Sequence, residues 1–299
     1  MKKYRDIVGD GGSNIVGQVE EQRTLLQARM ASIRRTIAVV SGKGGVGKSS
    51  VTSNLAATFA SQGRQVGVMD ADINGPSIAK MLGVRGQKLG VAAEGVLPAV
   101  TSQGIRVMSM DLLLPSDETP VKWDAPTQAE AHTWRGGMEA NAIREFLTDT
   151  VWGSLDFLLL DLPPGTDRLA TVAGILPGLS GAVIVTIPSE VSHLVVKKSI
   201  TVAKECKVPI LGLIENMAGY VCQKCGEIGE LFRGPGGEAL AEEFDIPFLG
   251  KIPFDPRMAV AADQGVPFVV EQLDSLAARA FIEIARKISA VLPLLILEA

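Results

Sequence analysis

The feature that most constrains this chain is a glycine- and lysine-rich segment placed between an apolar run and a helical pattern. Thr36–Ser41 is apolar and rich in β-branched residues, which predicts a buried strand, and Lys48–Gln62 has the pattern of a helix. The segment between them reads Gly42-Lys43-Gly44-Gly45-Val46-Gly47. Because glycine readily adopts the backbone angles of tight turns, the three parts predict one strand–loop–helix unit.

Strand-like and helical segments continue to alternate along the chain. Further strands are predicted at Gln65–Asp70, Arg106–Met110, Leu155–Asp161, Gly181–Ile187, Pro209–Glu215 and Phe248–Lys251. Helices are predicted at Pro76–Leu82, Glu139–Val151, Arg168–Leu176, Val191–Glu205, Gly237–Phe244, 256–264 and 272–290. The residues are 46% hydrophobic but only 5% aromatic, which suits a parallel sheet covered on both faces. We therefore predict a doubly wound, mostly parallel α/β fold.

The loop itself matches G-x-x-x-x-G-K-[ST], a pattern whose backbone N–H groups surround phosphate oxygens. Lys48 would face the β- and γ-phosphates of ATP or GTP, Ser49 would offer a hydroxyl to Mg²⁺, and the helix start would favour the anion. Gly42, Gly44 and Gly47 also spell the dinucleotide fingerprint G-x-G-x-x-G, but that class of protein does not need Lys48-Ser49. A glycine-rich turn without a ligand is a third interpretation, although four glycines in six positions would weaken a fold that gained nothing from them.

Acidic residues follow two of the predicted strands. Asp70 and Asp72 come at the end of the second strand, and Asp161 ends the apolar strand after Phe157. Ligands of such sheets bind at the carboxyl ends of the strands. One carboxylate can orient a water molecule for attack and another can hold Mg²⁺ through its water shell. Each acid alone could also cap a turn or a helix; the neighbouring phosphate loop favours a role in the nucleotide site.

Two of the three cysteines form the motif Cys222-x-x-Cys225. Two thiolates are half of the four ligands usual for zinc or an iron–sulfur cluster, so a symmetric dimer would complete the site. The residues alone leave cluster and zinc equally weighted, and a redox disulfide is less favoured because the pair does not open a helix. Cys206 is predicted to lie in the core. So few cysteines favour a reducing, cytoplasmic setting.

Several segments stand apart from the strand–helix alternation. Residues 1–34 are predicted to be a partly helical N-terminal segment, with a helix at Val19–Ile33, followed by one domain over residues 35–299. Residues 112–137 are predicted to be an irregular functional or interface loop, and residues 216–236 a second loop.

Membrane and nucleic-acid partners are not indicated. The apolar run 291–297 is too short to cross a bilayer; docking on the core or on a partner chain is favoured over a tail that touches a membrane. There is no secretory signal, and we expect no stable membrane association. The net charge of −4 and the pI of about 5.4 do not indicate a nucleic-acid partner.

The segment Lys43–Ser49 also fits K-G-G-x-G-K-[ST], and in this the chain resembles the deviant Walker A group of P-loop proteins, which includes MinD, ParA, the nitrogenase iron protein and the Mrp/ApbC proteins. Within that group the chain resembles the Mrp/ApbC iron–sulfur carrier family over about residues 35–270. The order of its motifs carries this resemblance: Asp70-Ala-Asp72-Ile-Asn-Gly-Pro-Ser77, Trp134-Arg135-Gly136, Trp152-Gly153, Asp161-Leu-Pro-Pro-Gly-Thr166, Glu215-Asn216-Met217, Cys222-x-x-Cys225-Gly226 and Gly250-Lys-Ile-Pro253-Phe-Asp255.

The resemblance implies a slowly hydrolysing, homodimeric ATPase that binds a labile [4Fe-4S] cluster between subunits, with a scaffold as donor and apo-proteins as recipients. It implies that Lys43 reaches the partner's nucleotide, that Asp72 lies in the water-positioning switch, and that Asp161 lies on the Mg²⁺ side. Residues implied to contact the nucleotide are Gly42, Lys43, Gly44, Gly45, Val46, Gly47, Lys48, Ser49, Ser50, Asp70, Asp161, Asn216, Pro253 and Asp255.

The sequence departs from the family pattern at two motifs. The usual Pro-Pro-Gly-Thr-Gly-Asp reads Pro164-Gly165-Thr166-Asp167-Arg168 at its end, so the acid lies one residue early. The usual Trp-Arg-Gly-Pro-Met has Gly137 in place of proline. A MinD/ParA-like positioning ATPase is the alternative function, although such a protein has no need of Cys222 and Cys225.

Overall fold

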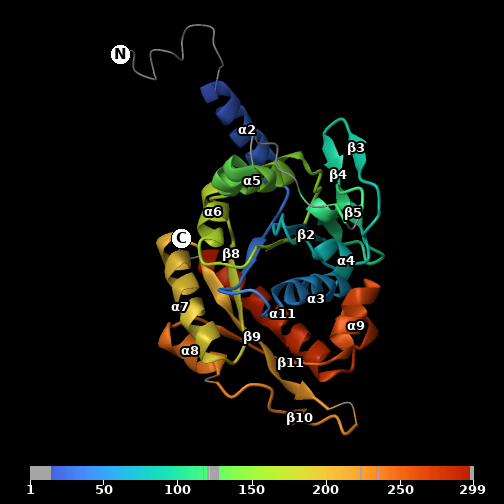
Figure 1. The fold of residues 1–299 in the computed structure, drawn as a ribbon, viewed down its shortest axis with the longest axis vertical. Coiled ribbons are helices and arrows are strands. Elements are labelled where there is room, and N and C mark those ends of the chain that lie inside the picture. Colours follow the sequence, from blue (N-terminus) through green and yellow to red (C-terminus); the bar gives the residue numbers. More distant parts are fainter. Residues whose placement is uncertain are drawn as a thin grey trace.

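The structure is a computed structural model that describes residues 15–116, 118–119, 121, 128–222, 224–234 and 236–296 (Figure 1). Its described part contains a nine-stranded sheet and a separate two-stranded hairpin, with helices on both faces of the large sheet. The predicted doubly wound, mostly parallel α/β fold is confirmed.

The large sheet has the strand order β10-β9-β8-β1-β7-β2-β6-β5, and β11 pairs with β9. Strands β5 and β10 pair antiparallel to their neighbours, and the other pairings are parallel. The strands are β1 (Thr36–Val40), β2 (Val66–Asp70), β5 (Ala99–Val100), β6 (Arg106–Met108), β7 (Phe157–Asp161), β8 (Gly181–Thr186), β9 (Ile210–Val221), β10 (Ile228–Gly229) and β11 (Phe248–Phe254). The hairpin consists of β3 (Gly90–Ala92) and β4 (Gly95–Leu97).

Both faces of the sheet are covered because its central strands are apolar on both faces. In β1, Ile37 and Val39 belong to one buried cluster and Ala38 and Val40 to the other, as the two-residue period of a strand requires. Helices α3, α4, α9, α10 and α11 supply residues to the first cluster, and α2, α5, α6, α7 and α8 supply residues to the second. The core is therefore two apolar layers on either side of one sheet.

The helices lie largely where the sequence predicts them. They are α2 (Ile15–Met30), α3 (Lys48–Ser61), α4 (Ile78–Met81), α5 (Gln128–Asp149), α6 (Arg168–Ile175), α7 (Glu190–Glu205), α8 (Gly237–Glu243), α9 (Arg257–Gln264), α10 (Phe268–Glu271) and α11 (Leu276–Ile296), with a 3₁₀ turn at Met110–Leu112. In α2, Leu26 is buried in the second cluster, so this helix packs on the domain. The division of the chain after residue 34 stays a prediction.

The prediction of a loop from residue 216 is wrong for its first part, because β9 continues to Val221. Asparagine, glycine and a positive φ at Met217 make this part of the strand look irregular locally. It is held by distant partners: Asn216 pairs with Ile252 of β11, and Val221 pairs with Ile228 of β10. Such long-range pairing leaves little trace in the local sequence.

The predicted starts of two helices are corrected by the structure. Helix α5 begins at Gln128 and not at Glu139, so part of the predicted irregular segment 112–137 is helical. The last helix begins at Leu276 instead of residue 272. The hairpin β3–β4 and strand β5 were not predicted, because they are short, glycine-bounded and partly exposed.

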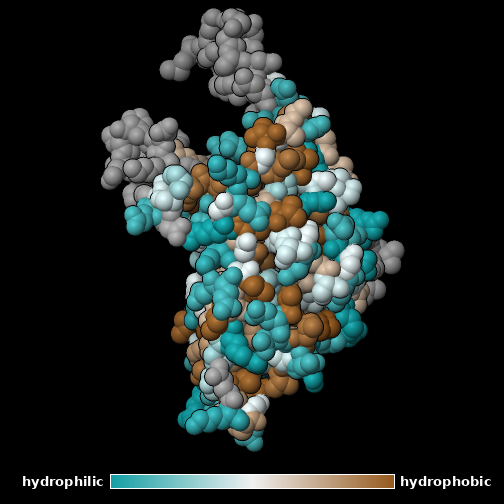
Figure 2. Space-filling model, turned by 90° about the vertical axis from the view of Figure 1, so that its right-hand side faces the viewer, coloured by the Kyte–Doolittle hydropathy of each residue, from teal (hydrophilic) through white to brown (hydrophobic). Residues whose placement is uncertain are grey.

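Among the residues that the structure describes, no helix is both long enough and apolar enough to cross a membrane. On the face drawn in Figure 2, hydrophobic residues are interspersed with hydrophilic ones. Of the apolar run 291–297, Leu292 is buried in the first core cluster, as part of α11. The run from residue 293 onward lies outside the residues whose side chains are described.

The packing of α11 leads to a stability prediction. Phe281 is fully buried between α11 and the sheet, whereas its neighbour Ile282 is 45% exposed. Phe281→Ala should lower the free energy of unfolding by about 3–5 kcal/mol, because it removes buried surface and leaves a cavity. Ile282→Ala is the control and should change it by less than about 0.5 kcal/mol. Urea denaturation measures both; equal effects would contradict the packing described.

Candidate nucleotide and cysteine sites

The predicted phosphate loop joins the end of β1 to the first turn of α3. Gly47 stands directly before the helix with φ of 77°, a left-handed conformation. A Cβ atom there would lie 2.4 Å from Nδ2 of Asn216, and one at Gly42 would lie 2.7 Å from Cγ1 of Val195. Glycine is therefore required at both positions by close neighbours, and at Gly47 by the backbone as well.

Lys48, Ser49 and Asp161 converge in the structure. The Lys48 ammonium lies 2.7 Å from Oδ2 of Asp161, and the Ser49 hydroxyl donates to the same oxygen at 2.6 Å. Thr52, one turn further along α3, donates to Oδ1 at 2.6 Å. Asp161 is fully buried and Lys48 is 7% exposed. The carboxylate at the end of β7 thus holds the phosphate loop and the first turn of α3 together.

Asp70 lies beside Asp161, since the two residues pair across β2 and β7. Its carboxylate is fully buried and accepts hydrogen bonds from the backbone N–H groups of Ser77, Ile78 and Asp72 and from the Ser109 hydroxyl. Burial, and next the Asp161 charge, raise the pKa of Asp70 to about 7, although the backbone donors and Lys48 act against this. The buried Asp70 carboxylate therefore anchors the backbone of the loop that follows β2.

Asp72 lies within that loop and is half-buried. Its Oδ1 accepts from the backbone N–H of Gly75 at 3.2 Å, which closes a turn. The structure thus brings Lys48, Ser49 and Asp161 into direct contact and places Asp72 in a loop leaving the neighbouring strand. The predicted catalytic role of Asp72 stays a prediction.

The converging groups fit a magnesium–nucleotide site in their chemistry. Hydroxyl and carboxylate oxygens suit Mg²⁺, which is bound by hard oxygen ligands and keeps several waters. Ser49 Oγ and Asp161 Oδ2 are the oxygens that would hold it, directly or through water, and Lys48 is the cation paired with this carboxylate. These groups pair with one another in the structure, so binding of a nucleotide would require Lys48 to turn from Asp161 toward phosphate.

The residues predicted to flank the nucleotide base come from β9 and from the end of β11. Asn216 is buried and donates from Nδ2 to the Val46 carbonyl at 2.8 Å, so it supports the phosphate loop. Pro253 is buried in β11. Asp255 accepts from Nη2 of Arg257 at 2.6 Å. Partial burial opposes ionisation of Asp255, but the hydrogen bonds from Arg257 hold its pKa below the usual value.

The two cysteines of the C-x-x-C motif follow the end of β9. Cys222 is half-buried, Cys225 is exposed, and both are free thiols. The backbone N–H groups of Cys225 and Lys224 lower the pKa of the Cys222 thiol. Cys225 lies 3.8 Å from a carboxylate oxygen of Glu227. Among the described residues, no three His, Cys, Asp or Glu side chains gather as a metal-ion site.

Two cavities bear on the assignment of the site. One of about 440 Å³ is lined by Cys222 and Gly226 on one side and by Asp255 and Arg257 on the other. It places the cysteine motif next to the loop after β11. A larger cavity of about 770 Å³ lies between α2 and the turn after α6. Its walls include Thr36, at the start of β1 and thus at the opposite end of the strand from the phosphate loop, so we do not assign it to the nucleotide.

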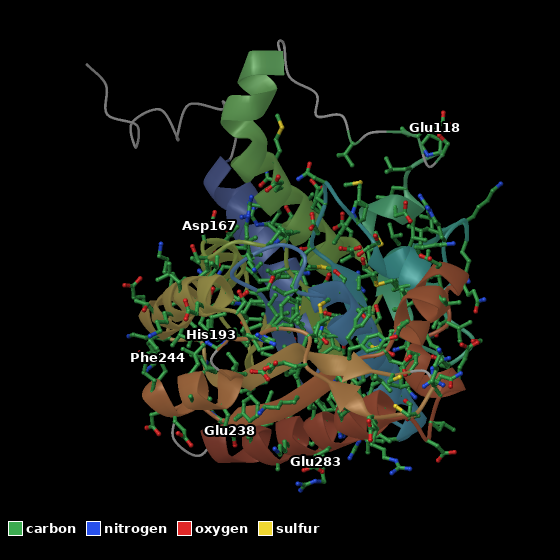
Figure 3. The ribbon with its side chains drawn as sticks, turned by 60° about the horizontal axis from the view of Figure 1, so that its bottom comes forward. Glu118, Asp167, His193, Glu238, Phe244 and Glu283 are labelled. Atoms are coloured by element: carbon green, nitrogen blue, oxygen red, sulfur yellow. The ribbon has the colours of Figure 1, made fainter. Side chains whose placement is uncertain are left out.

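The structure shows where the side chains of the altered motif after β7 lie. Asp167 is 76% exposed at the beginning of α6 (Figure 3). Arg168 instead turns inward and pairs with Glu139 of α5 at 2.7 Å. The acid that the family pattern places in this loop therefore points to solvent here.

Several residues that support the site were missed by sequence reasoning. Thr52 could have been found, because it lies three and four positions after Ser49 and Lys48 and so shares their helix face. Arg257 stands two residues after Asp255, but nothing local shows that it folds back. Ser109 comes to Asp70 only through the pairing of β6 with β2.

The buried pair of Lys48 and Asp161 leads to a second prediction. Lys48→Met should lower the free energy of unfolding of the nucleotide-free protein by about 3 kcal/mol, because it leaves a buried carboxylate without its cation. Adding Asp161→Asn should recover part of that loss, since the uncompensated charge is then gone. Urea denaturation of the two single variants and the double variant measures this; additive losses would contradict a direct coupling.

Comparison with known proteins agrees with the geometry. Residues 32–289 match a ParA family model described as NUBPL iron-transfer P-loop NTPase. An iron–sulfur cluster carrier protein of Saccharolobus solfataricus is 46% identical over 272 residues, which are 91% of this chain and 88% of the relative. An iron–sulfur cluster carrier protein of Methanocaldococcus jannaschii is 46% identical over 269 residues, which are 90% of this chain and 88% of the relative.

Solved structures show the same fold. A nucleotide-binding protein from Archaeoglobus fulgidus, in complex with ADP and with cobalt found, has a TM-score of 0.70 at 40% identity, covering 82% of this chain and 92% of that one. The MinD cell division protein of Aquifex aeolicus has a TM-score of 0.58 at 21% identity, covering 86% and 97%, which shows the fold alone. With its phosphate loop, its cysteine pair and these relatives, the chain belongs to the family of NUBPL-type iron-transfer P-loop NTPases within the ParA group.

Proposed function

We propose that this protein is an ATP-binding, slowly ATP-hydrolysing homodimer that carries a labile [4Fe-4S] cluster between its subunits. It receives the cluster from a scaffold and transfers it to apo-proteins in the reducing cytoplasm. The cluster is the cargo of the protein, and ATP with Mg²⁺ sets the state of the dimer. The observation that carries this proposal is a pair of free thiols, one half-buried and one exposed, at the end of a strand that also contacts the phosphate loop.

The nucleotide half of the proposal rests on the groups around Asp161. Lys48 supplies charge to the phosphates once it leaves the carboxylate, and Ser49 and Asp161 offer oxygens to Mg²⁺. Asp72 would orient the attacking water from the loop after β2, so that the proton has an acceptor near the γ-phosphate. The Archaeoglobus relative binds ADP, which supports a nucleotide at this site.

The cargo half rests on the cysteines. Cys222 and Cys225 supply two of the four thiolates that a [4Fe-4S] cluster needs, and a second copy related by two-fold symmetry supplies the others. The lowered pKa of Cys222 favours the thiolate that binds iron. Cys225 is exposed in the single chain, so its thiolate can reach a cluster shared with a second copy. The names of the curated relatives support a carrier.

The surroundings of Lys43 are an argument for the proposed dimer. Within the described part of the chain its ammonium forms no hydrogen bond or ion pair, and only its carbonyl is used, by the Ser41 hydroxyl. A lysine that the phosphate loop of its own chain does not hold is available to a nucleotide in the facing subunit. In such a dimer each nucleotide would be contacted by Lys48 of its own chain and by the partner subunit's Lys43.

Substitutions of Lys48 and Lys43 are predicted to remove different properties of the protein. Lys48→Ala should weaken ATP binding by about 100-fold or more, because the phosphates lose the cation of the loop. Monomeric Lys43→Ala should bind ATP with a Kd within about threefold of that of wild type. It should nevertheless lose ATP-dependent dimerisation and ATP hydrolysis. Calorimetry, sedimentation and phosphate release measure the three properties. If Lys43→Ala loses ATP affinity as completely as Lys48→Ala, the proposed contact across the dimer is wrong.

The experiment that tests the carrier function is anaerobic reconstitution with iron and sulfide, read by absorbance and by metal analysis. Wild type should take up about four iron atoms and four sulfides per dimer. Cys222→Ala and Cys225→Ala should lose the brown chromophore and keep ATP binding. Cys206→Ala is the matched control, because Cys206 lies away from the motif after α7, and it should behave as wild type.

The outcome that would overturn the cargo assignment is equally clear. Uptake of one zinc ion per dimer and no iron would show a structural metal instead of a carried cluster. For transfer, the loaded dimer is mixed with an apo-ferredoxin as a generic acceptor, and the cluster should move to it. A cluster retained by the dimer over hours would contradict the carrier function.

A further inference from the structure

A carboxylate of α5 connects the two loops that leave the nucleotide site. Glu139 is only 6% exposed. Its Oε1 accepts a hydrogen bond from Nδ2 of Asn74 at 2.5 Å, and its Oε2 accepts from Nη1 of Arg168 at 2.7 Å. Asn74 belongs to the loop after β2, and Arg168 is the first residue of α6 after the loop that follows β7. One side chain from a third element thus holds both loops.

Both loops leave strands whose last residues, Asp70 and Asp161, belong to the proposed nucleotide site. Asn74 lies two residues after Asp72, and Arg168 lies two residues after Thr166, which ends the motif that begins at Asp161. The strands from which the loops leave are neighbours, with Asp70 paired to Asp161. The loops therefore start side by side, and Glu139 bridges them a few residues further on.

The altered motif after β7 supplies the cation of this bridge. Asp167 is largely exposed, whereas Arg168, the next residue, turns toward α5 and pairs with Glu139. The side chain of Arg168 is 31% exposed and that of Glu139 is 8% exposed, so the pair is partly shielded from water. A shielded ion pair holds its geometry more firmly than one on an open surface.

We propose that Glu139 is a positioning residue of the ATPase site, which couples the Asp72 loop to the Thr166 loop so that the two move as one unit when the nucleotide changes. This inference rests on the proposed function and adds to it how the movements of these two loops are coupled. Glu139 does not touch the nucleotide; it acts through Asn74 and Arg168.

The physical reason is the cost of breaking the contacts that Glu139 makes with Asn74 and Arg168. A carboxylate in this setting is poorly solvated, and separating it from its partners is costly. If the Thr166 loop moves toward a phosphate and draws Arg168 along, Glu139 either follows, and shifts Asn74 with it, or loses its ion pair with Arg168. The arrangement with both contacts kept is favoured, so displacement of one loop biases the other.

The test compares Glu139→Gln, Arg168→Gln and the double variant. Glutamine at position 139 keeps an acceptor for Asn74 but removes the ion pair. Asn74→Ala removes the other contact at an exposed residue, so it tests the bridge without burying a new group. The control is Glu283→Gln, which breaks an exposed ion pair with Arg286 on the distant helix α11.

Two readouts are needed. The first is hydrogen exchange of peptides covering residues 71–77 and 162–168, with and without a non-hydrolysable ATP analogue and Mg²⁺. The second is the kcat of ATP hydrolysis measured beside the Kd of ATP. A role in global stability alone would change exchange throughout the protein, whereas a bridge between loops changes these two segments together.

The expected result is faster exchange in both loops of each bridge variant, a Kd for ATP within about threefold of wild type, and a kcat lowered by about tenfold. The double variant should be no worse than the more affected single variant, and Glu283→Gln should match wild type. Unchanged kcat, an effect confined to one loop, or losses that multiply in the double variant would overturn the proposal.

Failure of the proposed ATPase function can be distinguished from failure of the proposed role of Glu139. If wild type neither binds nor hydrolyses ATP, the ATPase function fails, while exchange in the nucleotide-free protein still reports whether the loops are coupled. If wild type hydrolyses ATP and the variants behave like the control, the ATPase function stands and the bridge has no role in it.

Discussion

The buried carboxylate of Asp161 is the interaction on which the rest of the site depends. It ends a strand that is apolar throughout, so the sheet places a charge where no water can stabilise it. Lys48, Ser49 and Thr52 satisfy it from the phosphate loop and the first turn of α3. The same contacts fix the first turn of α3, beside the proposed phosphate loop, to the end of β7. One cluster of side chains thus stabilises the nucleotide-free fold and also contains the groups proposed to bind the nucleotide. In this cluster a phosphate would compete with Asp161 for Lys48.

Strand β9 extends this dependence to the cysteines. Asn216 lies within it and bonds to the Val46 carbonyl, and Cys222 follows its last residue. Pairing with β10 and β11 on either side of this segment keeps it regular although its sequence is not. On the other side of the cavity, Arg257 is fixed by Asp255. The proposed nucleotide and cluster sites are therefore joined by one strand and one loop, which offers a physical route between ATP binding and cargo.

The fold could be predicted from local patterns wherever the apolar residues of a helix or strand recur with the period of that element and are buried. Apolar runs such as Phe157–Asp161 lie where predicted, because a central strand needs apolar residues on both faces. The continuation of β9 was missed, since its glycines and asparagine are compatible with a strand only beside β10 and β11. The start of α5 was missed as well, because the glycines Gly136 and Gly137 lie inside it and weaken the helical signal.

By itself the sequence determined the phosphate loop, the strand–helix alternation and the cysteine pair, because each is a matter of residue types at short spacing. The tertiary structure alone decided which distant side chains complete them. It turned Asp167 outward and Arg168 inward, and it brought Asn74 and Arg168 to one carboxylate of α5. Those contacts depend on strand order and on how helices pack on the sheet. Residues that are far apart in the chain become neighbours only after the core has formed, so local sequence patterns carry little information about them.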